Sequence, residues 1–474
     1  MTRWLSRRHP RYIRSIVYML QASEYSIRDF FRWHERVEDF RHVEKRKRLD
    51  FTLKATLLYV SGWLATFFAL AAAVLVFLNV GTPWNYVLSA LIVLEIPLIV
   101  LLGVLVVLTA LRFIQVPIEW FAMEQARRRL TVHKGIKIAI AGSFGKTSTR
   151  EILRAVLSEG KKVAAPSGSH NTPLAIAAFV RSLKGDEDVL IFELGEYYPG
   201  DVRKLARTIR PDWGIITGVN EAHLEKFKSL QVTTDTIFEL AEFVDPTQLY
   251  INGENELARN RRKHGNVLYS REGASTWQVS GLTSDLTGTR FTLSNDVSTF
   301  NVKSRLLGLH MAGPLVAAAD IGLRLGLTVA EFERGIGKTK PFAHRLEPRQ
   351  WEDGVTFLDD SYNGNPDGVR AVIEFLASLS GRRFYTTPGL VETGARIKEV
   401  HEAIGTELAK AGIEKVVLIK NSVTPHIEAG LKNTACKGEI LWYDDMPSAL
   451  SALRASSLPG DIILVQNDWP DQYA

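Results

Sequence analysis

The sequence predicts an α/β fold in which a P-loop central domain with a parallel sheet and a Rossmann-like C-terminal domain follow a two-helix transmembrane hairpin. Strand-like and helix-like segments alternate from Gly135 onward, as they do in proteins built on parallel sheets. A glycine-rich turn links the first of these strands to its helix, and two long apolar runs lie upstream. A chain of 474 residues has room for two or three domains.

Charge and cysteine content narrow the class of protein. The formal net charge is +6, and residues 1–50, with 13 Lys and Arg against 7 Asp and Glu, account for all of it. The rest of the chain is balanced, so we expect no nucleic-acid partner. The single cysteine, Cys436, excludes an internal disulfide framework and fits a reducing compartment.

The first element, residues 1–50, is predicted to be a basic amphipathic arm on the cytoplasmic side. Its arginines are interleaved with large apolar residues such as Trp4, Ile16 and Phe30. Two arrangements fit this pattern. One is a helix that lies on anionic lipid, and the other is a solvated helix that packs on the body of the protein.

The second element, residues 51–114, is predicted to be a transmembrane helical hairpin. Residues 55–80 contain no charged side chain, and residues 84–111 contain one, Glu95, to which we assign no function. About 20 residues of α-helix suffice to cross the hydrocarbon core of a bilayer. The link between the two runs is short and rich in turn residues. A buried helical hairpin of a soluble domain is the alternative.

Lysine and arginine flank the hairpin on one side only. Residues 45–48 precede it, Arg112 and residues 127–129 follow it, and the link carries neither residue type. This positive-inside pattern predicts a multi-pass protein of the cell inner membrane, with two helices and with both ends in the cytoplasm. The polar N-terminal 50 residues do not read as a signal peptide. Residues 115–134 are expected to form a linker helix.

The central domain, residues 135–344, is predicted to begin with a strand, a glycine-rich loop and a helix at residues 149–157. Glycines let backbone N–H groups approach an anion, and the start of a helix adds the positive end of its dipole. Ile140 stands where the usual spacing has its first glycine. An ordinary turn before a helix is the alternative to a nucleotide site. The residues expected to bind the phosphates of ATP are Gly142, Ser143, Gly145, Lys146, Thr147 and Ser148.

Two further strands of the central domain end at polar side chains. Residues 188–192 lead into Glu193, and residues 213–219 lead toward His223. Ligands of open α/β sheets bind beyond the carboxyl ends of the strands. Glu193 and His223 are therefore predicted to meet the Thr147 hydroxyl as a metal site beside the phosphates. Taken alone, His223 would more often be an ordinary loop histidine.

The C-terminal domain, residues 345–474, is predicted to be Rossmann-like. A strand at residues 355–358 is followed by the acid- and amide-rich residues 359–366 and then by an amphipathic helix. These residues suggest a loop that faces a ligand, although Asp, Ser and Asn also cap helices routinely. Further strands are expected at residues 382–386, 415–419, 439–443 and 461–465, and short strands of the central domain at residues 283–302.

These motifs together resemble those of the Mur ligase family, the ATP-dependent amide-forming enzymes of peptidoglycan synthesis. The loop at residues 142–148 matches the family's G-[TS]-x-G-K-[TS]-[TS], and Glu193-Leu194-Gly195 is similar to its E-[LM]-G strand end. The branch that adds D-alanyl-D-alanine has segments similar to residues 222–230, 345–347, 359–366 and 389–401. The resemblance covers residues 135–474.

The resemblance implies a reaction in two steps. A substrate carboxylate takes the γ-phosphate of ATP, and the amine of an amino acid or dipeptide then displaces phosphate from the acyl phosphate. Positioning and charge neutralisation would supply most of the catalysis. The implied roles are catalysis for Lys146, Glu193 and His223, Mg²⁺ binding for Thr147, Glu193 and His223, and nucleotide contacts for Asn171, Arg345 and Asp360.

The sequence departs from the family at three places. Ile237 stands at or near the position of a lysine that helps to hold the family's second metal ion. Met311 and Pro314 replace two asparagines near the adenine. The family's N-terminal domain, which holds a uridine nucleotide, has no counterpart. A free UDP-linked precursor is therefore not required as the acceptor, and the sequence leaves open whether the acceptor is UDP-linked or lipid-linked.

Three functions fit the sequence. The leading one is a membrane-anchored amide ligase of peptidoglycan precursor synthesis, with a carboxylate acceptor and an amino-acid or dipeptide donor. A poly-γ-glutamate-synthetase-like ligase is the alternative among enzymes. A non-catalytic, nucleotide-binding scaffold that recruits wall-synthesis proteins to the membrane is the third.

Overall fold

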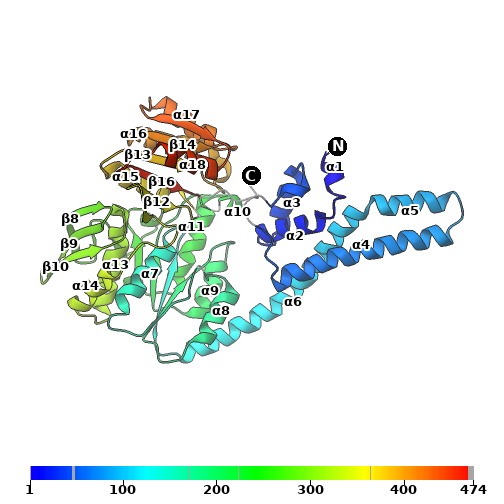
Figure 1. Ribbon diagram of the computed structural model, residues 1–474. Helices are drawn as coiled ribbons and strands as arrows, with labels where there is room; N and C mark the ends of the chain where they lie inside the picture. The colour runs from blue at the N-terminus through cyan, green and yellow to red at the C-terminus, as the bar shows by residue number, and fades with distance from the viewer. Residues whose placement is uncertain (1, 45–47, 169, 223, 363, 468–474) are drawn as a thin grey trace. The chain divides into compact units, whose positions relative to one another are not determined.

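The chain forms two compact units. The structure is a computed structural model that describes residues 2–44, 48–168, 170–222, 224–362 and 364–467. The first unit contains the described residues up to Trp120 and is built from helices. The second contains those from Phe121 onward and carries two sheets (Figure 1).

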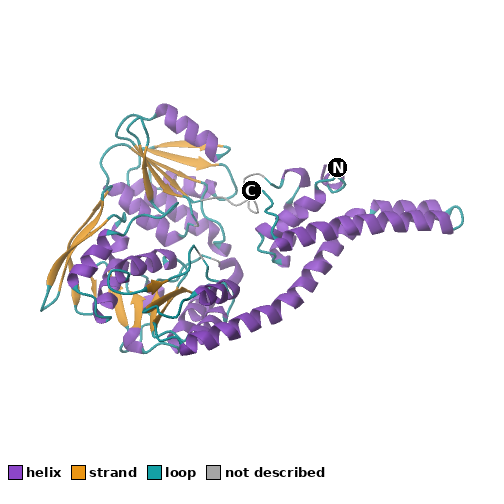
Figure 2. Ribbon diagram, turned by 60° about the horizontal axis from the view of Figure 1, so that its bottom comes forward, coloured by secondary structure: helices purple, strands orange, loops and turns teal. Residues whose placement is uncertain are grey.

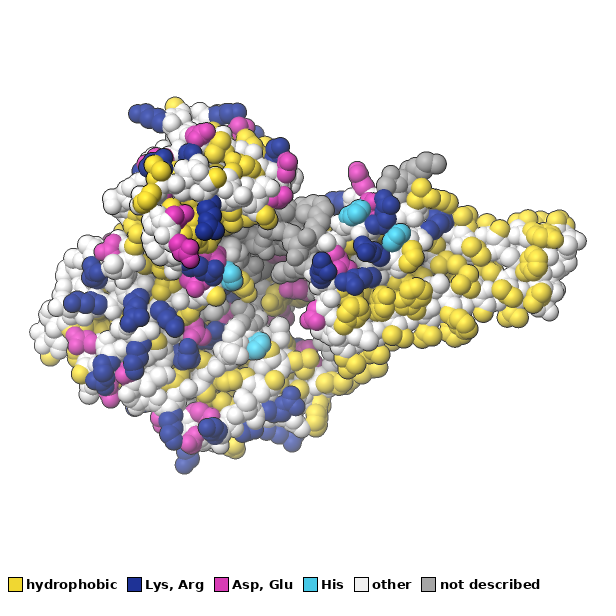
Figure 3. All heavy atoms as spheres, in the orientation of Figure 1, with side chains coloured by type: hydrophobic (Ala, Val, Ile, Leu, Met, Phe, Trp, Pro, Cys, Tyr) yellow, Lys and Arg dark blue, Asp and Glu magenta, His cyan; other side chains and the backbone are white. Residues whose placement is uncertain are grey.

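The first unit is built around a helical hairpin. Its helices are α4 (Leu53–Asn79), α5 (Trp84–Leu94) and α6 (Ile96–Val132), the last of which continues into the second unit. The Thr52 hydroxyl caps α4 by accepting a hydrogen bond from the backbone N–H of Ala55. By length and composition, α4 and α6 could each cross a membrane. Hydrophobic side chains cover most of the visible surface of the hairpin (Figure 3).

The second apolar run is divided into two helices. Helix α5 ends at Leu94, Glu95 forms the turn, and α6 begins at Ile96. Pro97 explains the break, because proline cannot donate a backbone hydrogen bond to the preceding turn of helix. Beyond this turn α6 is continuous, so residues 115–132 extend the helix of the second run.

The arm consists of α1 (Thr2–Ser6), α2 (Tyr12–Ala22), α3 (Ile27–Arg36) and the 3₁₀ turn η1 (Phe40–His42). Ile16 and Phe30 of the arm are fully buried in one cluster with Leu58 of α4 and Val104 of α6. Helix α2 reaches α4 at Gly62, where an added Cβ would lie 2.5 Å from Cγ2 of Ile13. The apolar side chains of the arm therefore pack on the hairpin, an arrangement that differs from both sequence expectations.

The larger sheet of the second unit has the strand order β10-β9-β8-β7-β6-β5-β4-β1-β3-β2. Strands β1 to β6 pair with one another in parallel. Strands β7 to β10 extend the sheet beyond β6 by antiparallel pairing. The strands are β1 (Ile136–Ala141), β2 (Val163–Ala164), β3 (Val189–Glu193), β4 (Trp213–Ile216), β5 (Leu249–Asn252), β6 (Val267–Ser270), β7 (Gly273–Ala274), β8 (Trp277–Asp285), β9 (Gly288–Ser294) and β10 (Thr299–Ser304).

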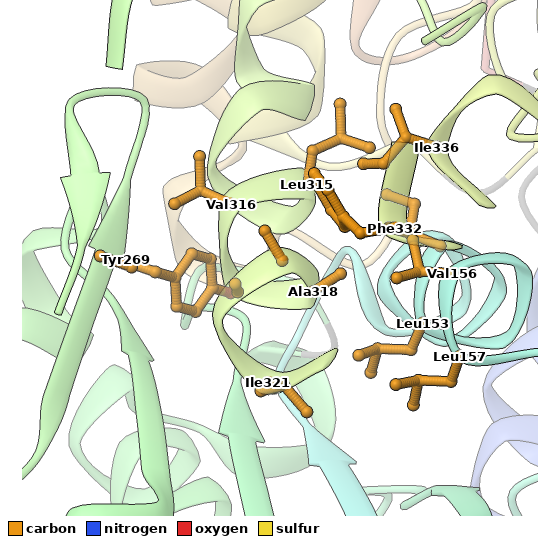
Figure 4. Packing of buried hydrophobic residues seen from close by; sticks show 14 of the residues in the cluster. Leu153, Val156, Leu157, Tyr269, Leu315, Val316, Ala318, Ile321, Phe332 and Ile336 are labelled. Carbon is orange, nitrogen blue, oxygen red and sulfur yellow. The ribbon is translucent and has the colours of Figure 1, made fainter. Parts of the chain in front are cut away.

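Helices bury both faces of this sheet (Figure 2). One face holds α7 (Lys146–Leu157), α13 (Ala312–Arg324) and α14 (Val329–Gly337), whose side chains interdigitate in Figure 4. Gly335 lets α14 approach α7, since a Cβ there would lie 2.6 Å from the Val156 backbone. The other face is covered by the end of α6 and by α8 (Pro173–Ser182), α9 (Asp201–Ile209) and α11 (Leu230–Phe238).

Short elements complete this part of the chain. They are α10 (Leu224–Phe227), α12 (Glu256–Arg259), η2 (Glu239–Glu242), η3 (Pro246–Gln248) and η4 (Leu309–Met311).

The second sheet has the order β11-β12-β16-β13-β14-β15, and only β11 pairs in the antiparallel sense. Helices α15, α16 and α17 pack on one face and α18 on the other. The elements are β11 (Glu347–Gln350), β12 (Thr356–Asp360), β13 (Arg383–Thr387), β14 (Lys415–Ile419), β15 (Glu439–Tyr443), β16 (Ile462–Gln466), α15 (Pro366–Ser378), η5 (Gly394–Arg396), α16 (Ile397–Lys410), α17 (Thr424–Asn433) and α18 (Met446–Ser456).

The α/β class predicted from the sequence is confirmed. Every strand expected from the apolar runs is present, and the short strands expected at residues 283–302 are β8 to β10, which span residues 277–304. The helix expected at residues 149–157 begins three residues earlier, at Lys146, directly after the left-handed Gly145.

Candidate active site

The glycine-rich loop connects β1 to α7, as the sequence predicts. Gly142 and Gly145 adopt φ values of 146° and 72°, which favour glycine. A Cβ on Gly142 would also lie 2.1 Å from the Thr217 hydroxyl. Ile140 is fully buried in β1, in register with Glu193 of β3 and Ile215 of β4. Because position 140 is still inside the strand, no glycine is needed there.

The residues that follow β4 form hydrogen bonds with the glycine-rich loop. The backbone N–H of Ser143 donates to the carbonyl of Gly218 at 2.9 Å. The Thr217 hydroxyl donates to the carbonyls of Ala141 and Phe144. Thr217 was missed in the sequence, where it reads only as the end of an apolar strand.

Glu193 and Thr147 come together as predicted. Glu193 is 2% exposed at the end of β3, and its carboxylate accepts a hydrogen bond from the Thr147 hydroxyl at 3.1 Å. Arg150, which is 1% exposed, donates to the same carboxylate at 3.0 Å and also to the carbonyl of Gly168. Arg150 therefore fixes Glu193 beside the loop, a role that sequence reasoning missed because helix α7 carries several other polar residues.

Lys146 points to a second carboxylate that the sequence analysis also missed. Its ammonium donates to Glu196 at 2.6 Å and to the carbonyl of Gly142. Glu196 is 3% exposed and lies in the turn that follows β3. The available signal was an acidic residue three positions after Glu193, at the carboxyl end of a parallel strand.

Three other predicted residues have different outcomes. Asn171 is buried, and its backbone carbonyl accepts from the N–H of Gly195 at 3.1 Å, so it lies beside the turn after Glu193. His223 lies outside the described residues. Ser148 is buried in the first turn of α7.

Arg345 and Asp360 come from the second sheet. The Arg345 guanidinium lies over the ring of Tyr362, 4.7 Å from its centroid. Burial lowers the pKa of Arg345, and the charges of Tyr362, Asp360 and Glu193 act against that shift. Arg345 is thus within electrostatic range of Glu193, so charged residues that follow strands of the two sheets lie near one another.

The Asp360 carboxylate accepts hydrogen bonds from the Gln466 amide at 2.7 Å and from the backbone N–H of Leu346 at 3.0 Å. Burial raises the pKa of Asp360 to about 7, against the opposing effects of Gln466 and Arg345. The charge of this group therefore depends on pH near neutrality.

Replacing Asp360 with asparagine is expected to remove a pH-dependent part of the stability. Its carboxyl titrates near pH 4 when the chain is unfolded and near 7 when it is folded. Between these values the folded chain binds more protons, so the free energy of unfolding falls as pH rises, by at most about 1.4 kcal/mol per pH unit. The thermal midpoint of the wild-type chain minus that of Asp360→Asn should decrease from about pH 5 to about pH 8. A constant difference would contradict this assignment.

Direct contacts join the two sheets near the loop. The Asn220 amide donates to Asn365 at 2.8 Å and to Asp367 at 3.0 Å, and Arg396 pairs with Glu221. A cavity of about 380 Å³ opens beside these contacts. Its lining combines apolar side chains, Val369 and Ile404 among them, with more acidic than basic ones.

Of the positions where the sequence departs from the family pattern, Ile237 is buried, whereas Met311 and Pro314 are half-buried. Ile237 is fully buried in the core beneath the larger sheet. Its neighbour Glu239 accepts from the backbone N–H groups of Gly200 and Arg203, and so caps the start of α9. Burial and the charge of Arg271 lower the pKa of His310 to about 4, which keeps this imidazole neutral.

Thr147 and Glu193 fit a magnesium ion, because a hydroxyl and a carboxylate are oxygen ligands at the phosphate loop. Within the described ranges there is no group of three or more His, Cys, Asp or Glu side chains that could hold a metal ion. ATP phosphates would supply further oxygens, as is usual for Mg²⁺.

Comparisons with known proteins agree with this geometry. Residues 140–321 match the family model of the Mur ligase middle domain, and residues 344–466 match that of the Mur ligase glutamate ligase domain. The UDP-N-acetylmuramoyl-tripeptide–D-alanyl-D-alanine ligase of Mycobacterium tuberculosis is 29% identical over 354 residues, which are 69% of each chain. The Bacillus subtilis ligase of the same name is 24% identical over 348 residues, or 72% of this chain and 75% of the relative.

Solved structures share the fold. MurF from Acinetobacter baumannii superposes with a TM-score of 0.67 at 19% identity, covering 75% of this chain and 78% of that one. The MurF ligase from Thermotoga maritima in complex with ADP gives a TM-score of 0.63 at 25% identity, covering 74% and 80%. Mur ligases are ATP-dependent amide ligases that form ADP and phosphate and use Mg²⁺. The two family models together match more than half of the sequence, and the chain belongs to the Mur ligase family.

Proposed function

We propose that this chain is a membrane-anchored, ATP-dependent peptide ligase of peptidoglycan precursor synthesis that adds D-alanyl-D-alanine, or a similar donor, to a carboxylate acceptor. The observation that carries the proposal is the convergence of Lys146, Thr147 and Glu193 at the edge of one sheet with Arg345 and Asp360 from the other. Each of these groups has a use in phosphoryl transfer, whereas a non-catalytic scaffold has no chemical need for the whole set.

In the first step an acceptor carboxylate oxygen attacks the γ-phosphorus of ATP, the bond to the β,γ-bridging oxygen breaks, and ADP leaves. Lys146 and Arg345 would neutralise the charge that spreads over the transferred phosphoryl group. Thr147 and Glu193, with His223, would hold Mg²⁺, which would supply positive charge and so lower the repulsion between the carboxylate and the phosphates. Arg150 would keep the Glu193 carboxylate oriented through their 3.0 Å contact.

In the second step the donor amine attacks the acyl carbon. The C–N bond forms, the C–O bond to phosphate breaks, and the amine loses a proton as phosphate leaves. The positive groups around the loop would also stabilise the tetrahedral intermediate. Contacts across the two sheets, such as those of Asn220 with Asn365 and Asp367, would keep the reacting groups in register.

The membrane anchor is the second part of the proposal. Helices α4 and α6 have the length and composition of membrane spans, and basic residues flank the hairpin on one side only. We propose five parts: an arm at residues 1–50, a transmembrane hairpin at 51–114, a linker at 115–134, and two cytoplasmic domains at 135–344 and 345–474. The anchor would hold the ligase at the inner membrane, near lipid-linked precursors and other wall-synthesis proteins.

Product analysis tests the ligase function. Full-length protein in detergent would be given ATP, Mg²⁺, D-alanyl-D-alanine and either the UDP-linked muramoyl-tripeptide or its lipid-linked counterpart. Phosphate release together with one dipeptide added to the acceptor, seen by mass spectrometry, is the expected result. Growth of a glutamate chain would indicate the poly-γ-glutamate alternative. ATP binding without turnover for any donor would indicate the scaffold.

Cysteine labelling tests the membrane topology. In a Cys436→Ser background, we expect a membrane-impermeant maleimide to label Thr82→Cys, in the hairpin link, on intact spheroplasts. Val297→Cys, at a position that is 89% exposed in the turn between β9 and β10, should be labelled only after lysis. Labelling of both positions only after lysis, with release of the chain by alkaline carbonate, would contradict the anchor.

A further inference from the structure

Arg345 lies between two residues whose backbones are left-handed. His344 and Leu346 adopt φ values of 61° and 49°, although neither is glycine. Such φ values are unfavourable for residues that carry a Cβ, and they persist in a fold only where other contacts enforce them. The conformation of this segment is therefore held by contacts with another part of the chain.

Those contacts come from the end of β12 and the residues that follow it. Nδ1 of His344 lies 2.9 Å from a carboxylate oxygen of Asp359. The backbone N–H of Leu346 donates to the Asp360 carboxylate at 3.0 Å. The backbone N–H of Tyr362 donates to the carbonyl of His344 at 3.1 Å. Both left-handed residues are thus fixed by hydrogen bonds to the end of one strand.

The Asp359 side chain is 7% exposed and accepts several hydrogen bonds. One carboxylate oxygen accepts from the Ser361 hydroxyl at 2.6 Å, and the other faces His344, with Arg349 at 3.5 Å. Burial acts to raise the pKa of Asp359, but its hydrogen bonds with Ser361 and His344 outweigh burial and lower the pKa. Because an ionised carboxylate can only accept, Nδ1 of His344 carries the proton of their hydrogen bond.

The side chain between the two left-handed residues is available to a ligand. In the parts of the chain that the structure describes, the Arg345 guanidinium has no hydrogen-bond or ion-pair partner, and it lies over the Tyr362 ring. Its position therefore depends on the backbone that carries it and on this ring. A guanidinium that neutralises a transferred phosphoryl group needs an accurate position, since a misplacement of about 1 Å can lower a rate by about 10²-fold.

We propose that the hydrogen bond between His344 and Asp359 holds the left-handed backbone beside Arg345 and so directs the guanidinium to the transferred phosphoryl group. His344 and Asp359 are positioning residues, because they act through Arg345. The inference rests on the proposed function, since it requires that Arg345 serves phosphoryl transfer.

Two substitutions at position 344 test the inference. His344→Ala removes the hydrogen bond but keeps a Cβ, so the left-handed backbone loses a contact that it needs. His344→Gly removes the same hydrogen bond, but glycine adopts this backbone readily. We expect the alanine variant to lower kcat for product formation by about tenfold and to change KM for ATP by less than about threefold, because the charge that Arg345 meets develops in the transition state. The glycine variant should keep kcat within about threefold of wild type.

Asp359→Asn tests the other partner of the hydrogen bond. Asparagine offers one acceptor oxygen in place of two, so it cannot hold both Ser361 and His344 as the carboxylate does. We expect it to lower kcat by about tenfold in the wild-type chain and by less than about threefold in the His344→Gly background, where the hydrogen bond is no longer needed. If the asparagine variant did not fold, the two variants at position 344 would decide.

Ser275→Ala is the matched control. Ser275 also has a left-handed backbone, with a φ of 56°, and it is exposed in the turn between β7 and β8. Alanine at this position should leave kcat unchanged, because the turn carries none of the groups assigned to the reaction.

The outcomes separate this inference from the proposed function. If alanine and glycine at position 344 lower kcat equally, the imidazole itself is required and the inference is wrong. If neither changes kcat, or if Asp359→Asn has the same effect in both backgrounds, the inference is also wrong while ATP-dependent ligation stands. Failure of the unsubstituted chain to form product from ATP would overturn the proposed function and the inference with it.

Discussion

Lys146→Met is expected to lower the rate of ATP-dependent product formation by about 10²- to 10³-fold, the usual cost of removing one charge-stabilising group from an acyl- or phosphoryl-transfer site. Methionine keeps the apolar stem and removes the ammonium that would neutralise the transferred phosphoryl group. The measurement is the initial rate of product release at saturating ATP, with the product identified by mass. A rate within about threefold of wild type would contradict the assignment of Lys146.

The same substitution removes the ammonium that lies 2.6 Å from the buried Glu196 carboxylate, so stability has to be separated from catalysis. An uncompensated buried charge is strongly destabilising, whereas removal of both charges is often nearly neutral. The double variant Lys146→Met with Glu196→Gln should therefore regain most of the thermal stability without regaining the rate. Lys162→Met, at a lysine whose side chain is 67% exposed, is the matched control and should retain wild-type activity and stability.

Arg150→Met is expected to reduce the free energy of unfolding of the second unit by about 3–5 kcal/mol. This is the range measured when one partner of a buried ion pair is removed, about 3–5 kcal/mol. Arg150 is 1% exposed, and its guanidinium contacts Glu193 at 3.0 Å and Glu151 at 2.8 Å. Its loss would leave the Glu193 carboxylate buried and poorly compensated. The measurement is the urea midpoint of the full chain in detergent.

Arg154→Met provides the comparison, because Arg154 lies one helical turn further along α7. It pairs with Glu151 at 2.6 Å, but its side chain is 53% exposed, and such surface pairs contribute at most about 1 kcal/mol. Equal losses of stability in the two variants would show that the burial of Arg150 does not matter. If Arg150 orients Glu193, its variant should also need more Mg²⁺ for half-maximal activity than the Arg154 variant.

Features that are encoded locally could be predicted from the amino-acid sequence. Strand ends, the left-handed glycines and the start of α7 follow from short stretches of chain, and they were predicted to within a few residues. The break at Glu95 is also local, since Pro97 is two residues away, but the apolar composition around it hid the signal. Ile140 takes the place of the usual first glycine without consequence, because its register shows that it is still part of strand β1.

Partners far apart in sequence could not be predicted in this way. A burial pattern tells which face of an element is covered, but not by what, so the arm appeared suited to lipid although its apolar face packs on α4 and α6. Glu196 and Arg150 were overlooked for the same reason. Glu196 meets Lys146 only because the segment after β3 reaches the loop, and Arg150 meets Glu193 only because β3 ends beside α7.

The sequence by itself determined the α/β class, the phosphate loop and the set of residues from Lys146 to Asp360 that links this chain to the Mur ligases, because glycine conformations and strand ends are set within a few residues. Only the tertiary structure decided which charges meet. Glu193 faces Thr147 and Arg150, Glu196 faces Lys146, and Arg345 comes within range of Glu193 from another sheet. The physical reason is that electrostatic interactions depend on distance and burial, and both are fixed only when the parallel strands and the turns beyond them assemble.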